Sequence, residues 1–199
     1  MNIEFTDIHK GDEKNFAFYF YNYEVWDVEY KWDDNLNEEL EKELKRKDVW
    51  LNPRKKLRSN YNGSSLVVDK ICNDLIAQKN EILEYFDSYK PDYFKNQWVR
   101  GLDHYKKTSK MLVGIFWDQP GFQITPHLDN RHLIIQGIIN LTNNESSTQY
   151  HSILSWDTVY TAKKERHTGS MFVNGPGMVH SIKNPNKDRY ILYASIIDF

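Results

Sequence analysis

Short hydrophobic segments separated by turn residues fill the chain from residue 111 onward. They are rich in β-branched and aromatic side chains, which is typical of strands, and Gly, Pro, Asn and Asp interrupt them. The strong segments are 111–118, 122–129, 132–141, 169–175 and 189–199, with weaker ones at 148–154 and 158–162. Because no long helix fits between them, the pattern disfavours βαβ units and predicts an antiparallel sandwich or jelly roll.

The first 100 residues carry a different periodicity. Leu36, Leu40 and Leu44 form one stripe within the charged segment 35–46, which predicts a short surface helix. Apolar residues at helical spacing predict a longer helix over 65–86. The expected fold class is therefore mainly β with N-terminal helices, a double-stranded β-helix of the jelly-roll, cupin-like kind.

The length of 199 residues suits one domain. We expect residues 1–110 to form a mixed, partly helical support region and residues 111–199 to form the β core. The helices should brace the outer face of that core.

Composition narrows the classes of partner. The formal net charge is -2, so the chain lacks the basic field that favours nucleic acid or an acidic membrane. The single cysteine, Cys72, excludes an intrachain disulfide and any cysteine-based metal site. We expect a cytoplasmic protein, with no apolar run long enough for a signal peptide or a membrane span. Its oligomeric state is not predicted.

A local basic cluster, Arg54-Lys55-Lys56-Leu57-Arg58, interrupts the N-terminal half. Such a cluster can contact a phosphate group, but it is more often a solvated loop. We interpret it as a loop.

The candidate chemistry lies in the β region. His127 and Asp129 are two residues apart on a predicted strand, so both side chains should point to the same face. His180 follows a Gly/Pro turn at the start of another strand, which can face the first in a jelly roll. Two imidazoles and one carboxylate hold one face of an octahedral metal and leave three positions open, the arrangement of non-haem Fe(II) oxygenases.

A 2-oxo acid can fill two of the open positions and leave the third for O2. Its distal carboxylate then needs a second anchor. Arg189 begins the last predicted strand, and its planar guanidinium suits bidentate binding of a carboxylate.

These residues carry a resemblance to a known family. The run Pro126-His127-Leu128-Asp129, the segment 169–174 with His180, and Arg189 opening the last strand together resemble the Fe(II)/2-oxoglutarate-dependent oxygenases, especially the prolyl-hydroxylase-like branch. The resemblance covers about residues 111–199. It implies that His127, Asp129 and His180 are iron ligands and that Arg189 pairs with the distal carboxylate of 2-oxoglutarate. It also implies a double-stranded β-helix.

The chain departs from this pattern at one position. Many relatives place Ser or Thr two residues after the Arg, whereas this chain has Ile191. Tyr193 and Ser195 share the face of Arg189 and are candidates to assist it. Asn140 closes its strand and can meet the co-substrate or cap the strand end.

We therefore expect an oxygenase that binds Fe(II), 2-oxoglutarate and O2 and releases succinate and CO2, most simply as a hydroxylase. Its substrate is unidentified, with a small molecule or a protein side chain favoured over nucleic acid. Two alternatives stay open: a cupin-type metalloenzyme that does not use 2-oxoglutarate, and a non-catalytic jelly-roll binding or structural module. We interpret His104, His151 and His167 as surface residues, and Arg131 with His132 as candidates for the substrate entrance.

Overall fold

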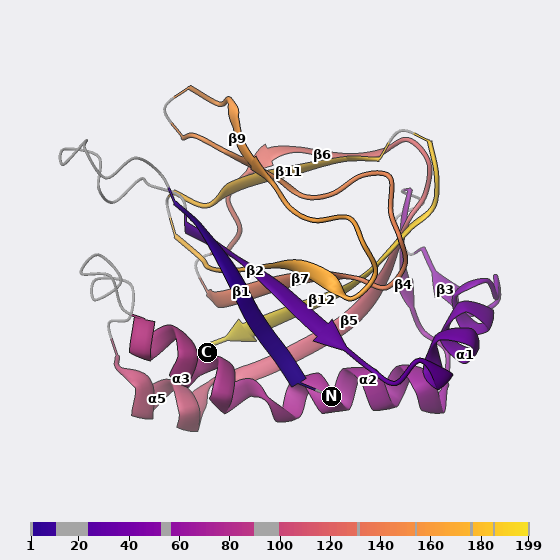
Figure 1. Cartoon of the computed structure of the whole chain (residues 1–199), viewed down its shortest axis with the longest axis horizontal. Coiled ribbons are helices and arrows are strands. Elements are labelled where there is room, and N and C mark those ends of the chain that lie inside the picture. The colour runs from indigo at the N-terminus through magenta and orange to yellow at the C-terminus, as the bar shows by residue number, and fades with distance from the viewer. Residues whose placement is uncertain are drawn as a thin grey trace.

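Two antiparallel β-sheets face each other, and helices cover the outer face of the larger sheet (Figure 1). The computed structural model describes residues 2–10, 24–52, 57–89, 100–130, 132–153, 155–175, 177–184 and 186–198. Within these ranges, no helix is long and apolar enough to span a membrane.

The larger sheet, called here the major sheet, has eight strands in the order β1-β2-β10-β7-β12-β5-β4-β3. Their bounds are β1 Asn2–Lys10, β2 Glu24–Lys31, β10 Thr168–Val173, β7 Leu133–Asn140, β12 Arg189–Ile197, β5 Lys110–Asp118, β4 Arg58–Tyr61 and β3 Trp50–Leu51. The last predicted strand, β12, lies near the middle and pairs along its length with both β5 and β7. Chain segments far apart in sequence therefore form one continuous surface.

The smaller sheet, called here the minor sheet, has four strands in the order β6-β11-β8-β9. Their bounds are β6 Phe122–His127, β11 Val179–Asn184, β8 Gln149–His151 and β9 Thr158–Thr161. Figure 1 shows β6, β11 and β9 on the side of the major sheet opposite the helices. The strands predicted from residue 111 onward are confirmed, including the two weak ones.

Four strands of the N-terminal region extend the major sheet at both edges. We expected a mixed, partly helical region there, without assigning strands within it. In β2, the side chains of Trp26, Val28 and Tyr30 alternate with polar residues, and all three are fully buried. This period of two is the ordinary signal of a strand.

The described helices are α1 Asn35–Leu44, α2 Leu66–Ala77, α3 Lys79–Tyr89 and α5 Leu102–Thr108. The short helix predicted near residue 35 is confirmed. The single helix predicted over 65–86 is wrong, because the chain breaks it at Gln78 into α2 and α3. The Gln78 side chain accepts a hydrogen bond from the backbone N–H of Ile3 at 2.7 Å, and Lys79 donates to the backbone oxygens of Lys106 and Ser109. At Gln78 and Lys79 the chain thus makes tertiary hydrogen bonds where one continuous helix was predicted.

The main hydrophobic core fills the space between these helices and the major sheet. Leu192, Ala194 and Ile196 of β12 point into it, facing helix residues such as Leu75 and Leu83, and all are at most 2% exposed. The alternate residues of β12 point to the other face of the sheet, toward the minor sheet. A mainly β fold with helices on one face, as the sequence predicts, leaves that second face for the site.

Candidate functional site

His127, Asp129 and His180 come together between the two sheets. His127 ends β6, Asp129 follows two residues later, and His180 on β11 pairs directly with His127 in the minor sheet. One potential ligand atom from each residue lies within 4.8 Å of the others. The antiparallel pairing of β6 with β11 therefore converts two distant sequence positions into one cluster.

Backbone carbonyls orient both imidazole rings. Nδ1 of His127 lies 2.9 Å from the oxygen of Thr125, and Nδ1 of His180 lies 3.0 Å from the oxygen of Met178. Because a carbonyl only accepts, each Nδ1 carries the proton and donates it. Nε2 of each ring then faces Asp129, at 3.5 Å from His127 and 3.1 Å from His180. Such backbone acceptors are the usual support for metal-ligating histidines.

The electrostatics of the cluster favour a charged carboxylate. Burial alone would raise the pKa of Asp129, but hydrogen bonds from His127 and His180 outweigh it and hold that pKa well below its usual range. The hydrogen bond to Asp129 raises the pKa of His127 against the effect of burial. Asp129 is therefore ionised at neutral pH and available as an anionic ligand.

One side of the cluster is closed and the other is open. His180 has a side chain only 8% exposed, and its ring lies 5.3 Å from that of Phe172 and 6.2 Å from that of Tyr150. The side chains of His127 and Asp129 are 33% and 21% exposed. A metal held here would thus have its free positions toward the cavity.

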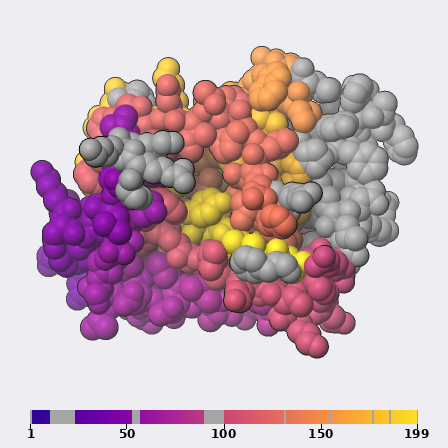
Figure 2. Space-filling view, turned by 180° about the vertical axis from the view of Figure 1, so that it is seen from behind, coloured from indigo at the N-terminus to yellow at the C-terminus, as the bar shows by residue number. Residues whose placement is uncertain are grey.

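A cavity of about 160 Å³ extends from this cluster between the sheets. Its lining includes the three cluster residues together with Arg58, Arg189, Ile191 and Tyr193. Seen from behind, the molecule is hollowed, with C-terminal residues in yellow at the floor of the hollow (Figure 2). The volume is well below the ~300 to 1,000 Å³ of pockets that enclose drug-sized ligands, so it suits a small molecule.

Arg189 is a buried cation in this cavity, only 2% exposed. Its Nη1 donates to Asp118 at 2.9 Å, and its Nη2 donates to the hydroxyl of Thr148 at 3.4 Å. Its Nε is buried and has no hydrogen-bond partner within the described residues. Burial lowers the pKa of Arg189 despite the neighbouring Asp118. A buried guanidinium with a donor to spare is suited to an incoming anion.

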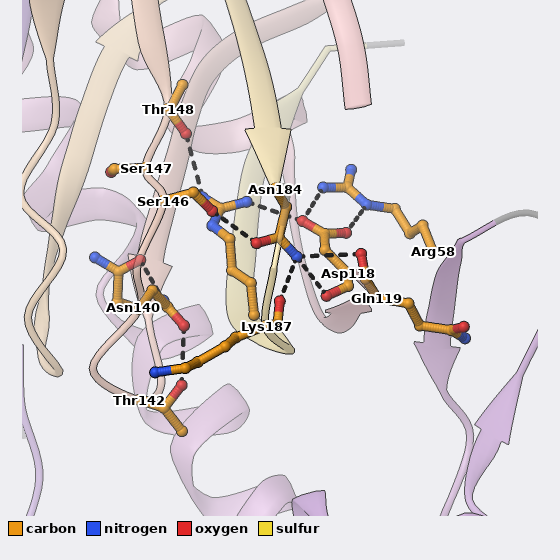
Figure 3. Close-up of polar contacts among 12 residues, drawn as sticks. Arg58, Asp118, Gln119, Asn140, Thr142, Ser146, Ser147, Thr148, Asn184 and Lys187 are labelled. Atoms are coloured by element: carbon orange, nitrogen blue, oxygen red, sulfur yellow. Dashed lines mark hydrogen bonds and ion pairs between the residues drawn. The ribbon is translucent and has the colours of Figure 1, made fainter. Parts of the chain in front are cut away.

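The amide of Asn184, next to Asp118, connects several loops. Nδ2 of Asn184 donates to the backbone oxygens of Asp118, Gln119 and Lys187, and Oδ1 accepts from the hydroxyl of Ser146 (Figure 3). Asn184 is 1% exposed. It therefore joins the turn between β5 and β6 to the loop that leads into β12.

The other candidate residues differ in placement. Tyr193 lines the cavity, and its hydroxyl donates to Oε1 of Gln136 at 2.6 Å. Asn140 and Ser195 are buried but are not among the residues that line the cavity. Both amide hydrogens of Asn140 are directed at backbone oxygens, those of Lys163 and Thr168.

The remaining histidines need one correction. His151 is buried, at 5% exposed, and not at the surface as expected, because β8 lies inside the minor sheet between β11 and β9. It bonds to the hydroxyl of Ser181 at 2.7 Å. His104 and His167 are half-buried, and His132 is exposed. Arg131 lies outside the described residues.

Three cavity-end residues were missed by sequence reasoning: Arg58, Asp118 and Thr148. Arg58 ends the basic cluster that we had interpreted as a loop, and it begins β4. Asp118 ends a predicted strand, and only its pairing with Arg189 across the sheet shows that it faces inward. A charged residue at the end of an apolar strand is a weak signal, but it was available.

The sequence matches no family model and no curated protein sequence. Solved structures do resemble the chain. A prolyl-4-hydroxylase of Pseudomonas putida has a TM-score of 0.59 at 12% identity over 88% of this chain and 92% of the other. A prolyl hydroxylase of Trichoplax adhaerens, in complex with a hypoxia-inducible-factor peptide, has a TM-score of 0.58 at 13% identity over 87% of this chain and 83% of the other. HygX of Streptomyces hygroscopicus, with nickel and 2-oxoglutarate bound, has a TM-score of 0.56 at 9% identity over 94% of this chain and 87% of the other.

At these identities the likeness concerns the fold. The chain has the jelly-roll fold of 2-oxoglutarate oxygenases, which confirms the predicted fold class. The likeness covers most of the chain, including N-terminal residues for which the sequence suggested no relative.

Proposed function

We propose that this chain is an Fe(II)- and 2-oxoglutarate-dependent oxygenase that hydroxylates a substrate and releases succinate and CO2. The observation that carries the proposal is the location of the His127, Asp129 and His180 cluster in the same cavity as the buried Arg189. A set of three metal-ligating side chains alone is found in many enzymes, and a buried arginine alone is found in many anion-binding sites. Their combination in a small cavity suits a metal-chelating 2-oxo acid with a second carboxylate.

The residues present fit the metal. Two imidazole nitrogens and a carboxylate oxygen are the donor set of mononuclear non-haem Fe(II) sites. The Nδ1 hydrogen bonds hold Nε2 of both rings toward Asp129, so the donors are oriented before any ion arrives. Bound there, Fe(II) would supply O2 activation coupled to decarboxylation of the 2-oxo acid.

The chain's own residues would have three tasks. His127, Asp129 and His180 hold the metal by one face and leave the side toward the cavity free. Arg189 binds the distal carboxylate of the co-substrate, with Tyr193 on the same wall. The apolar part of the lining, including Ile191, keeps water out of the cavity.

The substrate is proposed only as a class. A cavity of about 160 Å³ that also holds a co-substrate leaves little room, so the reacting C–H bond must be presented at the mouth. A protein side chain or a small molecule can do so. One structurally similar hydroxylase has a peptide bound, which is compatible with the first possibility.

The test is an anaerobic titration of the metal-free protein with Fe(II) and then 2-oxoglutarate, followed through the visible charge-transfer band of the chelated complex. We expect uptake of one Fe(II) per chain and a band in the wild type. Arg189→Ala should weaken the band, and His180→Ala should abolish metal uptake and succinate formation while the protein stays folded. The matched control is His104→Ala, a half-buried histidine outside the cavity.

Two results would contradict the proposal. Iron binding without a band would favour a cupin-type metalloenzyme, in which activity is indifferent to Arg189. No iron binding at all would favour a non-catalytic jelly-roll module.

A further inference from the structure

A second arginine occupies the same cavity as Arg189. Arg58 begins β4, next to β5 in the major sheet, and pairs in register with Asp118. Its Nε and Nη2 both donate to the Asp118 carboxylate, with Nη2 at 2.8 Å from Oδ2. Figure 3 shows Arg58 paired with Asp118. Asp118 is fully buried and also accepts from Arg189, so one carboxylate joins two guanidiniums.

Aromatic rings hold Arg58 in place. Its Cζ lies 4.4 Å from the ring centroid of Phe122 and 5.3 Å from that of Phe116. Arg58 is therefore fixed from β6 of the minor sheet as well as from β5. Its side chain is only 25% exposed, and among the described residues no hydrogen bond uses its Nη1.

The charges at this end of the cavity do not balance. Arg189 and Asp118 alone would form a neutral pair with little attraction for an anion. Arg58 adds one positive charge, so the three groups carry a net charge of about +1 in a largely dehydrated site, where an opposite charge is attracted strongly. Nη1 of Arg58 and Nε of Arg189 are the donors without a described partner. One bound carboxylate would neutralise this net charge, and its oxygens can accept hydrogen bonds from guanidinium donors.

We propose that Arg58 and Arg189, both oriented by Asp118, together bind the distal carboxylate of the co-substrate, and that Arg58 sets the preference for a 2-oxo diacid over a 2-oxo monoacid. This inference rests on the proposed function, because it places the 2-oxo acid in this cavity. It gives the N-terminal region a part in the site through its basic cluster. It also makes Asp118 a positioning residue that acts through the two arginines.

The test compares two ligands that differ at the distal carboxylate. 2-Oxoglutarate and 2-oxopentanoate share a 2-oxo acid chain, and a methyl group replaces the distal carboxylate in the second. Their affinities for the Fe(II)-loaded protein are measured anaerobically by calorimetry and by the charge-transfer band, so turnover is not needed. The variants are Arg58→Gln and Arg58→Lys, with Arg46→Gln as the control because Arg46 pairs with Glu43 and Asp48 at the surface.

We expect Arg58→Gln to lower the affinity for 2-oxoglutarate on the order of 10- to 100-fold, the usual range for losing a hydrogen bond between charged groups. Its affinity for 2-oxopentanoate should change by less than about 3-fold, since that ligand has no charge for Arg58 to bind. Arg58→Lys keeps the charge but not the planar fork, so its loss should be smaller. Arg46→Gln should match the wild type for both ligands.

Three outcomes would overturn the inference. Equal losses for both ligands in Arg58→Gln and Arg58→Lys would mean that Arg58 only fastens β4 to β5. An unchanged affinity for 2-oxoglutarate in folded Arg58→Gln would mean that Arg189 acts alone, while the proposed function would stand. Failure of the wild type to bind 2-oxoglutarate would overturn both proposals. If Arg58→Gln does not fold, as judged by circular dichroism, Arg58→Lys supplies the comparison.

Discussion

Both faces of the major sheet bury side chains, but the two sets of side chains differ chemically. On the face toward the helices, Trp26, Ile139 and Leu192 contribute to a continuous apolar core. On the face toward the minor sheet, the buried side chains include charged and polar ones, each at most 4% exposed: Asp27, Asp118, Gln136, Asn140, Ser170, Arg189 and Ser195. Adjacent positions on the same strands supply both sets, because side chains alternate along a strand.

The contrast separates stability from chemistry. Apolar burial on the helix side stabilises the fold without any requirement for pairing. A buried charge on the cavity side is tolerated only when it is paired, as Asp118 is with Arg58 and Arg189. The stability of the face toward the cavity therefore depends on specific charge partners. The stability of the face toward the helices depends on how completely apolar side chains fill the core.

Loss of the shared carboxylate should have the largest effect. Asp118→Asn would leave two guanidiniums near each other without their counter-ion, and we expect it to lower the free energy of unfolding by about 3–5 kcal/mol. Urea unfolding followed by circular dichroism measures the change. The control is Glu145→Gln, which breaks the exposed ion pair with Lys187 and should cost less than about 1 kcal/mol. Equal costs for the two variants would show that the Asp118 pairs contribute no more than a surface ion pair.

Two neighbours on β12 test the faces directly. Leu192→Ala on the helix face should cost about 2–5 kcal/mol of unfolding free energy, because it leaves a void in a close-packed core. Ile191→Ala on the cavity face should cost less, because the atoms removed border an existing cavity. It should instead alter ligand affinity, which calorimetry with 2-oxoglutarate would detect. A larger loss of stability for Ile191→Ala would reverse the comparison.

A neutral hydrogen bond on the cavity face should matter less than the ion pairs. Tyr150 and Ser170 share a hydrogen bond of 2.7 Å between buried hydroxyls. Tyr150→Phe would leave the Ser170 hydroxyl without this partner, at an expected cost of about 1–2 kcal/mol. Thermal unfolding measures it. Since only the hydroxyl is lost and the ring beside His180 remains, Fe(II) affinity should stay within about 2-fold of the wild type.

The smallest effect concerns the one thiol, which packs on the helix side. Burial raises the pKa of Cys72 to about 11. Because the folded pKa exceeds the unfolded value of about 8.5, the contribution of the thiol to stability is complete below pH 8.5 and is lost as the pH rises through about 11. Alkylation by iodoacetamide at pH 8 should therefore be roughly 100-fold slower than in urea. Equal rates in the two conditions would show that the partly buried Cys72 thiol is not protected by the fold.

Much of the fold was readable from local pattern. The strands of the β core and the helix near residue 35 follow from periods of two or 3.6 residues. His127 and Asp129 lie close together as expected, although β6 ends at His127 and Asp129 lies beyond the strand. The break at Gln78 was not predicted, because a long-range hydrogen bond to Ile3 accompanies it. The burial of His151 was also missed, since nothing in its own segment shows that β8 lies between two other strands.

Periodicity along the chain was enough to indicate which side chains share a face, because alternation is a property of each strand alone. It was not enough to show which strands are neighbours. The contact of Arg58 with Asp118 depends on β4 pairing with β5, across 60 residues of sequence. Periodicity also does not distinguish the two faces of the major sheet. The strands alternate apolar and polar residues, but the packing of helices on one side and of the minor sheet on the other decided which face became core and which became cavity. Sheet order and layer packing arise from the summed burial of the whole chain, and no short segment carries that information.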